Sequence, residues 1–260
     1  MSCKLEICST LLNRVFHEVL TMVWEKVKKS FAYFFNAQGL RYEIRHPKRA
    51  ISGNLIPLIK HPYLFYRTRN VKGLITFEVG TALYEEVLRS RHKSANIVEV
   101  GIYKGMSTIY LAEAAKKVHK RVKSFDWFCG LPDASPVLDP NFKAGNLVSD
   151  INEWERNVRK NTSREVVDLT VGDAREIMLP TLKNEGFALA FLDVDLYDVT
   201  RDVLFQLGSL ASGGEVIIIH DAHSPGIKKA ISEFQTLCGH PVKERYFAGN
   251  STVKLTICFS

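Results

Sequence analysis

The chain has 260 residues, of which 46% are hydrophobic, 10% aromatic and 24% charged. This composition is typical of a globular protein and excludes a disordered chain, a collagen and a coiled coil. The formal net charge is +7, but residues 1–95 hold 16 Lys and Arg against 7 Asp and Glu, whereas residues 96–260 hold 19 against 21. An enzyme that acts on nucleic acid surrounds its active site with positive potential. The slightly acidic larger part of the chain therefore argues against a nucleic-acid partner.

The N-terminal segment predicts one amphipathic helix over residues 10–36. Its apolar side chains recur at steps of three or four positions. They are Leu12, Val15, Val19, Val23, Val27, Phe31 and Phe34. We expect this apolar face to pack on the main domain or on a second subunit in a homodimer, with peripheral contact to a membrane as the alternative. Residues 19–24 are free of charge but fall far short of the roughly 20 residues that a membrane span requires.

The connection to the rest of the chain is predicted as loop. Residues 37–75 hold three of the nine prolines and no sustained periodicity, so residues 1–75 are interpreted as a basic N-terminal extension and residues 76–260 as the main domain. Helical spacing returns at residues 77–91. The five cysteines lack the spacing of metal ligands and no secretion signal is recognisable, which together predict reduced thiols in a cytoplasmic protein.

From about residue 95, short apolar runs alternate with segments of helical periodicity. The runs are Ile97–Gly101, Val122–Phe128, Val166–Gly172, Ala188–Asp193 and Glu215–His220. The helical segments between them include Thr108–Val118, Asn152–Arg159 and Val199–Leu210. The interiors of the runs are too apolar for strands with one exposed face, which favours a parallel sheet covered on both faces.

Two final runs, Val242–Phe247 and Val253–Phe259, follow one another across a short Gly-Asn-Ser turn. The turn leaves no room for a helix, so these runs are predicted to form an antiparallel hairpin. The fold class is therefore α/β: a doubly wound, seven-stranded sheet with an antiparallel C-terminal hairpin and an N-terminal helical extension.

The first predicted strand ends in a turn that suits a ligand. Gly101 and Gly105 allow the backbone to turn tightly and to approach a ligand closely, while Ser107 and Thr108 are predicted to open a helix whose free N–H groups point the same way. The G-x-G-x-x-G fingerprint of dinucleotide-binding folds is absent, which does not favour a pyrophosphate site.

Acidic residues end the next two predicted strands. Asp126, in Ser-Phe-Asp-Trp-Phe, is placed to accept hydrogen bonds from two ribose hydroxyls, and Asp173, in Val-Gly-Asp-Ala, is placed to receive the amine of an adenine. Each acid alone is a common loop residue. Three consecutive strand ends with glycine or acid in register indicate a nucleoside-containing ligand.

Five segments together resemble the class I S-adenosylmethionine-dependent methyltransferases, specifically the macrocin-type sugar O-methyltransferase family. They are EVGIYKGMST, SFDWFCGLPD, VGDAREIMLP, FLDVDLYDVTRDVL and GGEVIIIHDAHSPGIKKAISEF. The resemblance covers roughly residues 75–260, and its most specific parts are Asp193–Tyr197, Phe128–Pro132 and Pro225–Phe234. It implies a Rossmann-like methyltransferase fold, S-adenosylmethionine as methyl donor, and a sugar or glycosylated small molecule as hydroxyl acceptor.

The resemblance also implies roles for single residues. Glu99, Gly101 and Gly105 are expected to contact the methionine portion of the donor, Asp126 its ribose and Asp173 its adenine. Trp127 either stacks on the adenine or fills the core. The full set expected to contact the donor is Glu99, Gly101, Gly105, Ser107, Thr108, Asp126, Trp127, Asp173, Ala174 and Asp193.

Asp193 and Asp195 follow the fourth predicted strand, and Asp221 follows the fifth. These strands are neighbours in a doubly wound sheet, so their carboxyl ends lie side by side. Oxygen ligands of this kind suit Mg²⁺, and the resemblance implies a metal that grips vicinal sugar hydroxyls and lowers the pKa of one of them.

This chain departs from the macrocin pattern at the fifth strand, where His220-Asp221-Ala222-His223 replaces Asp-Asp-Tyr. An imidazole ligand favours Mn²⁺ or Zn²⁺ over Mg²⁺, or the histidines act as bases near neutral pH. We expect Asp193, Asp221 and His220 to hold the metal, and Asp193 to organise the acceptor hydroxyl. Asp195 or His223 is expected to be the general base.

Two alternatives to sugar O-methylation remain from the sequence. The first is a catechol-type O-methyltransferase acting on an aromatic diol, which the placement of Asp193 and Asp221 on adjacent strands also suits. The second is a non-catalytic module that keeps the fold and uses residues 10–36 to dock on a membrane or a partner.

Overall fold

A computed structural model describes residues 56–247 and 251–259. Ile56 begins a compact unit that extends to the C-terminus. The amphipathic helix predicted over residues 10–36, with its expected dimer or membrane contact, lies outside the described residues. Within the described part of the chain, no helix has both the length and the apolar character needed to cross a bilayer.

The centre of this unit is one seven-stranded sheet in the order β3-β2-β1-β4-β5-β7-β6. Its strands are β1 (Ile97–Val100), β2 (Val122–Asp126), β3 (Val167–Val171), β4 (Leu189–Leu192), β5 (Val216–Ile219), β6 (Val242–Phe247) and β7 (Thr252–Ile257). The first five are parallel, and β7 runs antiparallel between β5 and β6. The predicted doubly wound sheet with a C-terminal hairpin is thus confirmed.

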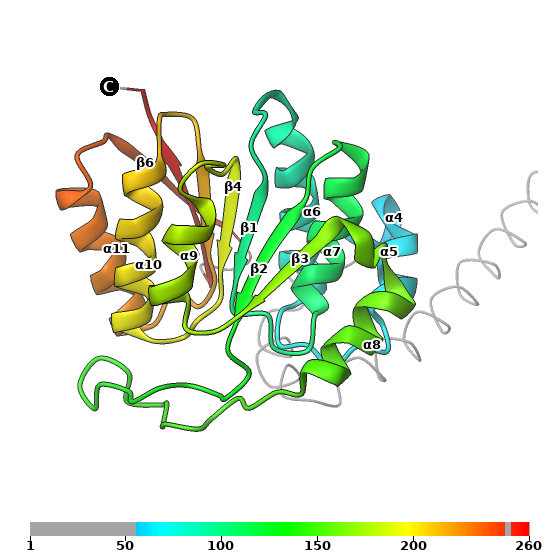
Figure 1. Ribbon diagram of the computed structural model, residues 1–260, viewed down its shortest axis with the longest axis horizontal. Coiled ribbons are helices and arrows are strands. Elements are labelled where there is room, and N and C mark those ends of the chain that lie inside the picture. Colours follow the sequence, from blue (N-terminus) through cyan, green and yellow to red (C-terminus); the bar gives the residue numbers. More distant parts are fainter. Residues whose placement is uncertain (1–55, 248–250, 260) are drawn as a thin grey trace, which may run out of the picture. The chain divides into compact units, whose positions relative to one another are not determined.

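Helices cover both faces of the sheet (Figure 1). The larger helices are α6 (Phe77–Arg89), α7 (Met106–Lys117), α8 (Ile151–Asn161), α9 (Ala174–Leu182), α10 (Tyr197–Leu210) and α11 (Pro225–Leu237). Single 3₁₀ turns lie at Ser90–His92 and Arg164–Val166. Helix α6 packs against α7, and α10 packs against both α9 and α11. Every residue of β1 and β4 is buried, as expected for central strands with helices on both sides.

Residues 56–68 correct one prediction. The loop expected there is replaced by two short helices, α4 (Ile56–Lys60) and α5 (Pro62–Thr68). Proline suggested a loop, but Pro62 occupies the first turn of α5, where a missing N–H costs nothing. Leu64 is fully buried, and the Thr68 hydroxyl hydrogen-bonds with that of Tyr110 on α7 at 3.0 Å. These residues therefore belong to the packed unit.

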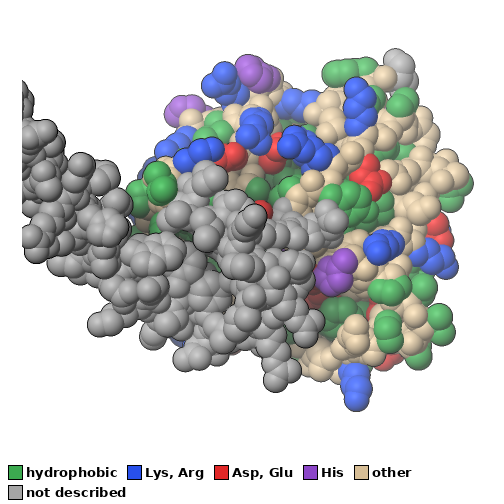
Figure 2. All heavy atoms as spheres, turned by 180° about the vertical axis from the view of Figure 1, so that it is seen from behind, with side chains coloured by type: hydrophobic (Ala, Val, Ile, Leu, Met, Phe, Trp, Pro, Cys, Tyr) green, Lys and Arg blue, Asp and Glu red, His purple; other side chains and the backbone are tan. Residues whose placement is uncertain are grey.

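Charged side chains of both signs share the surface. In Figure 2, Lys and Arg side chains gather along the upper part of the visible face with acidic side chains between them. Among the ion pairs of the described residues, Arg89 pairs with Glu85 and Glu86, and Lys254 on β7 also pairs with Glu86. Part of the positive charge of the compact unit is thus balanced locally.

Candidate active site

The turn after β1 is shaped by two glycines in the left-handed region, Gly101 (φ 81°) and Gly105 (φ 87°). A Cβ atom at Gly101 would lie 2.1 Å from the carbonyl oxygen of Asp193, and one at Gly105 would lie 2.9 Å from the Trp154 ring. Only glycine combines this conformation with such close packing. Both glycines have the role in the turn that their spacing predicts.

The start of α7 agrees with the prediction. The helix begins at Met106, with left-handed Gly105 at the N-cap and no side-chain cap, so Ser107 and Thr108 lie in its first turn as expected. Both side chains are buried in the first turn. The Thr108 hydroxyl donates to Glu99 Oε2 at 2.9 Å. Thr108 thus joins α7 to β1, and the expected donor contacts of Ser107 and Thr108 stay predictions.

Glu99 lies on β1 and is completely buried. Its Oε2 atom accepts hydrogen bonds from Thr108 and from the Ser124 hydroxyl on β2, the latter at 2.8 Å. Its Oε1 atom has no partner within the described residues. Burial raises the pKa of Glu99 to about 7, although the surrounding hydroxyls lower it. The hydrogen bonds of Glu99 to Thr108 and Ser124 join β1 to α7 and β2. The contact of Glu99 with the donor stays a prediction.

Asp126, at the end of β2, organises the turn after β1. Its Oδ2 atom accepts hydrogen bonds from the N–H groups of Ile102 and Tyr103, at 2.8 and 3.2 Å, and its Oδ1 atom accepts from the N–H of Phe128 at 2.7 Å. A carboxylate offers about four lone-pair positions, so it can also accept bonds from the ribose hydroxyls predicted for it. The adjacent Trp127 indole N–H donates to the carbonyl of Gly130.

Asp173, at the end of β3, caps α9 by accepting the N–H of Arg175 at 2.9 Å. The Arg175 guanidinium also grips its carboxylate, with Nη2 2.5 Å from Oδ2, and holds the pKa of Asp173 below its ordinary value. Ala174 is the buried first residue of α9. The sequence analysis did not predict the ion pair between Arg175 and Asp173. The signal for it was a basic residue two positions after an acid at a helix start. The adenine contact of Asp173 stays a prediction.

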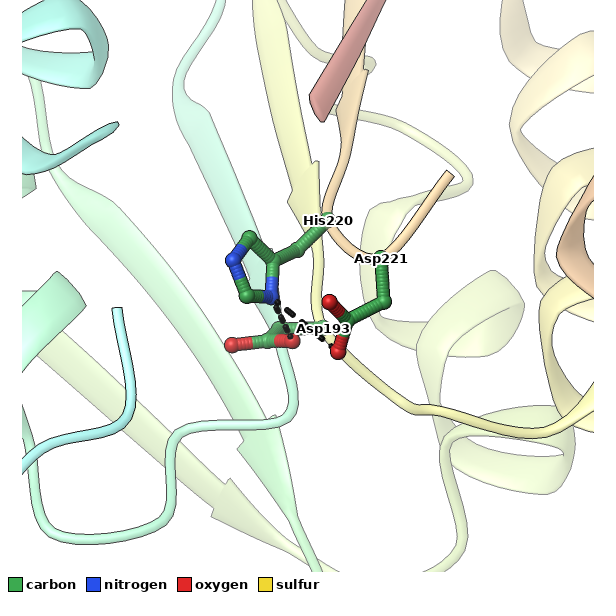
Figure 3. Close-up of side chains that lie close together, drawn as sticks. All are labelled: Asp193, His220 and Asp221. Carbon is green, nitrogen blue, oxygen red and sulfur yellow. Dashed lines mark hydrogen bonds and ion pairs between the residues drawn. The ribbon is translucent and has the colours of Figure 1, made fainter. Parts of the chain in front are cut away.

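Three side chains meet where β4 and β5 end (Figure 3). Asp193 follows β4, and His220 and Asp221 follow β5. The His220 Nδ1 atom lies 3.0 Å from Asp193 Oδ1 and 3.5 Å from Asp221 Oδ2. Burial opposes a charge on His220, but the two carboxylates outweigh it and hold the pKa of His220 well above its ordinary value. The predicted metal ligands thus come together in space.

The two residues predicted as general base are placed differently. Asp195 adopts φ 62°, and burial, with the nearby charges of Asp193 and Asp221, raises its pKa to about 8. His223 has a side chain that is 65% exposed, and its Nδ1 lies 3.8 Å from Asp221 Oδ1. Burial beside the carboxylates of Asp193 and Asp221 therefore favours Asp195, because the His223 side chain is largely exposed.

The cluster has the composition of a cation site. One ligand atom from each of Asp193, His220 and Asp221 can be chosen so that all three atoms lie within 4.8 Å of one another. Two carboxylate oxygens and one imidazole nitrogen suit Mn²⁺ or Zn²⁺ as well as Mg²⁺. Only a neutral His220 ring can be a ligand, so a cation there would compete with the proton that the two carboxylates favour on this ring.

The tyrosine of the D-x-D-L-Y segment does not join this cluster. The Tyr197 hydroxyl donates to Glu233 Oε2 at 2.8 Å, and Lys229 lies over the ring, 4.7 Å from its centre. Tyr197 ends the motif Asp193–Tyr197, and Glu233 belongs to the motif Pro225–Phe234. Their hydrogen bond therefore joins the two motifs, from the first turn of α10 to α11.

Comparison with known proteins finds one matching family. A family model described as a methyltransferase domain matches residues 98–222, a segment that holds the turn after β1, the acidic strand ends and the cluster. Residues 98–222 of this chain thus match a methyltransferase domain, and the sheet that contains them has the strand order 3-2-1-4-5-7-6. The resemblance seen in the sequence is confirmed at the level of a methyltransferase domain, which supports S-adenosylmethionine as the methyl donor. A comparison with curated protein sequences finds no significant match.

Solved structures share the fold of this domain at low identity. The O-methyltransferase NovP is 21% identical, with a TM-score of 0.60 over 70% of this chain and 82% of its own. The calicheamicin methyltransferase CalS11 is 20% identical, with a TM-score of 0.56 over 89% of this chain and 91% of its own. TomG from Streptomyces achromogenes, solved with S-adenosylmethionine, is 17% identical, with a TM-score of 0.53 over 78% and 90%.

Proposed function

We propose that this methyltransferase domain transfers a methyl group from S-adenosylmethionine to a hydroxyl of a sugar or a glycosylated small molecule, with a divalent cation at the Asp193 cluster. The observation that carries the proposal is the packing of the donor turn at Gly101 directly on Asp193. The donor and the acceptor hydroxyl would then meet at one edge of the sheet. The sugar acceptor is supported by the fold of CalS11, described as a TDP-rhamnose 3′-O-methyltransferase.

Different residues would bind the donor, hold the cation and remove the proton. The turn from Gly101 to Gly105, held by Asp126, receives the donor. Asp193, His220 and Asp221 would hold the cation, which supplies a positive charge that lowers the pKa of the acceptor hydroxyl. The hydroxyl oxygen forms a bond to the methyl carbon while the carbon–sulfur bond breaks, which leaves S-adenosylhomocysteine. Asp195 takes the hydroxyl proton once it is ionised, and the positive charge of a cation at the neighbouring cluster would favour that ionised form against the burial that raises its pKa to about 8. The fixed positions of donor and acceptor supply much of the rate.

The first experiment is calorimetric titration of the protein with S-adenosylmethionine and S-adenosylhomocysteine. It is followed by mass-spectrometric assays with TDP-rhamnose, simple glycosides and catechols, each with Mg²⁺ or Mn²⁺. We expect donor binding and methylation of a sugar hydroxyl. Methylation of catechols alone would replace the sugar acceptor by an aromatic diol. Absence of donor binding would contradict the enzyme and favour the non-catalytic module.

A pair of variants then tests the cluster. Asp193→Ala is expected to abolish methyl transfer while donor affinity changes little, because Asp193 acts on the acceptor side. Asp198→Ala is the matched control, since Asp198 is an exposed acid in the first turn of α10. Full turnover in Asp193→Ala would contradict the role of this residue.

A further inference from the structure

A long loop follows β2 at the edge of the sheet where the Asp193 cluster lies. Residues 127–150 connect β2 to α8 and contain no helix or strand. In Figure 1 this loop extends along the lower edge, below α9, α10 and α11. Connections of this length without secondary structure are commonly binding loops or active-site lids. The way in which residues 127–150 are held therefore bears on the acceptor side of the site.

The loop is internally ordered. The N–H of Leu131 donates to the carbonyl of Asn146 at 2.7 Å, and the N–H of Gly145 donates back to the carbonyl of Leu131 at 2.8 Å. Leu131 and Phe142 pack against the hydrophobic core. The two arms of the loop are thus joined, so a contact near its middle fixes the whole segment.

One carboxylate provides such a contact. Asp139 is only 2% exposed, and its Oδ1 atom accepts the N–H of Tyr197 at 3.1 Å while its Oδ2 atom accepts the N–H of Ser135 at 3.3 Å. Tyr197 is the first residue of α10, and Leu196 at the N-cap provides no side-chain cap. Asp139 therefore caps α10 from a distant segment, at a helix end where a negative charge is favourable.

The start of α11 meets the same carboxylate. The N–H of Gly226 donates to the carbonyl of Leu138 at 3.0 Å. A Cβ atom at Gly226 would lie 2.3 Å from Asp139 Oδ1 and 3.0 Å from the Cβ atom of Tyr197. The glycine of the P-G-x-x-x-A-x-x-E-F segment is thus required by the close approach of the loop. Helix α10 begins two residues after Asp195, and α11 begins four residues after Asp221. The loop is therefore attached to both segments that carry the acidic residues of the site.

We propose that Asp139 is a positioning residue, which anchors residues 127–150 on the first turns of α10 and α11 and so holds the acceptor against Asp193 and Asp195. The effect on the acceptor rests on the proposed function. The anchoring itself does not, because it follows from the contacts of Asp139 and Gly226.

Limited trypsin digestion tests the anchoring, because Lys143 is the only Lys or Arg between Trp127 and Asp150 and is exposed. We expect Asp139→Ala and Gly226→Ala to speed cleavage after Lys143 about tenfold, through the loss of a hydrogen bond to a charged group and the resulting opening of the loop. Affinity for S-adenosylhomocysteine should stay within about twofold of wild type. Asp139→Asn keeps one acceptor oxygen and should restore most of the protection. Asp133→Ala, an exposed acid of the same loop, should cleave at the wild-type rate.

Cleavage after Lys143 at the wild-type rate in both Asp139→Ala and Gly226→Ala would overturn the proposal. If Asp139→Ala does not fold, Gly226→Ala alone decides the test. With an acceptor from the panel above, Asp139→Ala should raise the KM for the acceptor without changing donor affinity, and Asp139→Asn should reverse the change. Equal KM values in wild type and Asp139→Ala would also overturn it. Failure of every acceptor would count against the proposed function and leave the cleavage result standing.

Discussion

Gly101 and Asp193 are in direct backbone contact, so that a Cβ atom at Gly101 would lie 2.1 Å from the Asp193 carbonyl oxygen. The N–H of Asp193 also donates to the carbonyl of Val100 at 2.9 Å. The turn expected to receive the donor and the residue expected to organise the acceptor are therefore packed directly against each other. A side chain added at Gly101 should therefore be felt at Asp193, whereas a change confined to the Asp193 side chain leaves this backbone contact intact.

Comparing Gly101→Ala with Gly186→Ala should separate the effect of close packing from the effect of backbone strain. Gly186 is the matched control, because it also has a positive φ (60°) and a Cβ atom added there would meet nothing within 4 Å. Gly186→Ala should cost about 1–2 kcal/mol of unfolding free energy from strain alone, with donor affinity unchanged. Gly101→Ala should cost more in urea unfolding and weaken S-adenosylhomocysteine binding in calorimetry. Equal effects of the two variants would contradict the proposed role of this contact.

Asp126→Ala should weaken donor binding by roughly 1–3 kcal/mol, the range for a lost hydrogen bond to a charged group. It should also lower the unfolding free energy, because three backbone N–H groups lose their acceptor. The comparison is Asp150→Ala, which removes an acid that accepts one N–H at the start of α8. Calorimetry should show weaker donor binding in Asp126→Ala only. Unchanged affinity there would argue against the ribose contact.

Glu99 should make the stability of the domain depend on pH. Its folded pKa of about 7 lies above its ordinary value of 4.5, so the folded state binds the proton more tightly. The resulting stabilisation is complete below pH 4.5 and is lost as the pH rises through 7. Between pH 5 and pH 7.5 the wild type should lose about 2 kcal/mol more unfolding free energy than Glu99→Gln, measured with urea. Parallel pH profiles of the two proteins would refute this assignment.

The Asp193 cluster should bind Mn²⁺ at least as tightly as Mg²⁺, because its third ligand is an imidazole nitrogen. Titration of the protein with Mn²⁺, followed by electron paramagnetic resonance, measures the affinity without an acceptor. Asp193→Asn should weaken binding by about tenfold or more, whereas Asp198→Asn, in an exposed acid nearby, should not. Equal Mn²⁺ affinities in these two variants would exclude Asp193 as a ligand.

The fold class followed from the sequence because its signals are local. Apolar runs such as the one at residues 188–193 are too long and too uniform for strands with an exposed face, and the structure buries all of β4. The left-handed turns at Gly101 and Gly105 also follow from residue type, since glycine has no Cβ. The helices α4 and α5 were missed because Pro62 disrupts a helix interior but suits a first turn, and only the packing of Leu64 decides between these states.

The residue types and the strand order in the sequence determined which acids gather at the carboxyl edge of this sheet. Tertiary structure decided what each one touches. Asp173 is held by Arg175, Tyr197 turns to Glu233, and His220 reaches Asp193 while His223 stays exposed. Asp139 stands out least in the sequence, since it is an ordinary loop aspartate there. Its role depends on the backbones of Tyr197 and Gly226, which lie far along the chain and meet it only in the folded state.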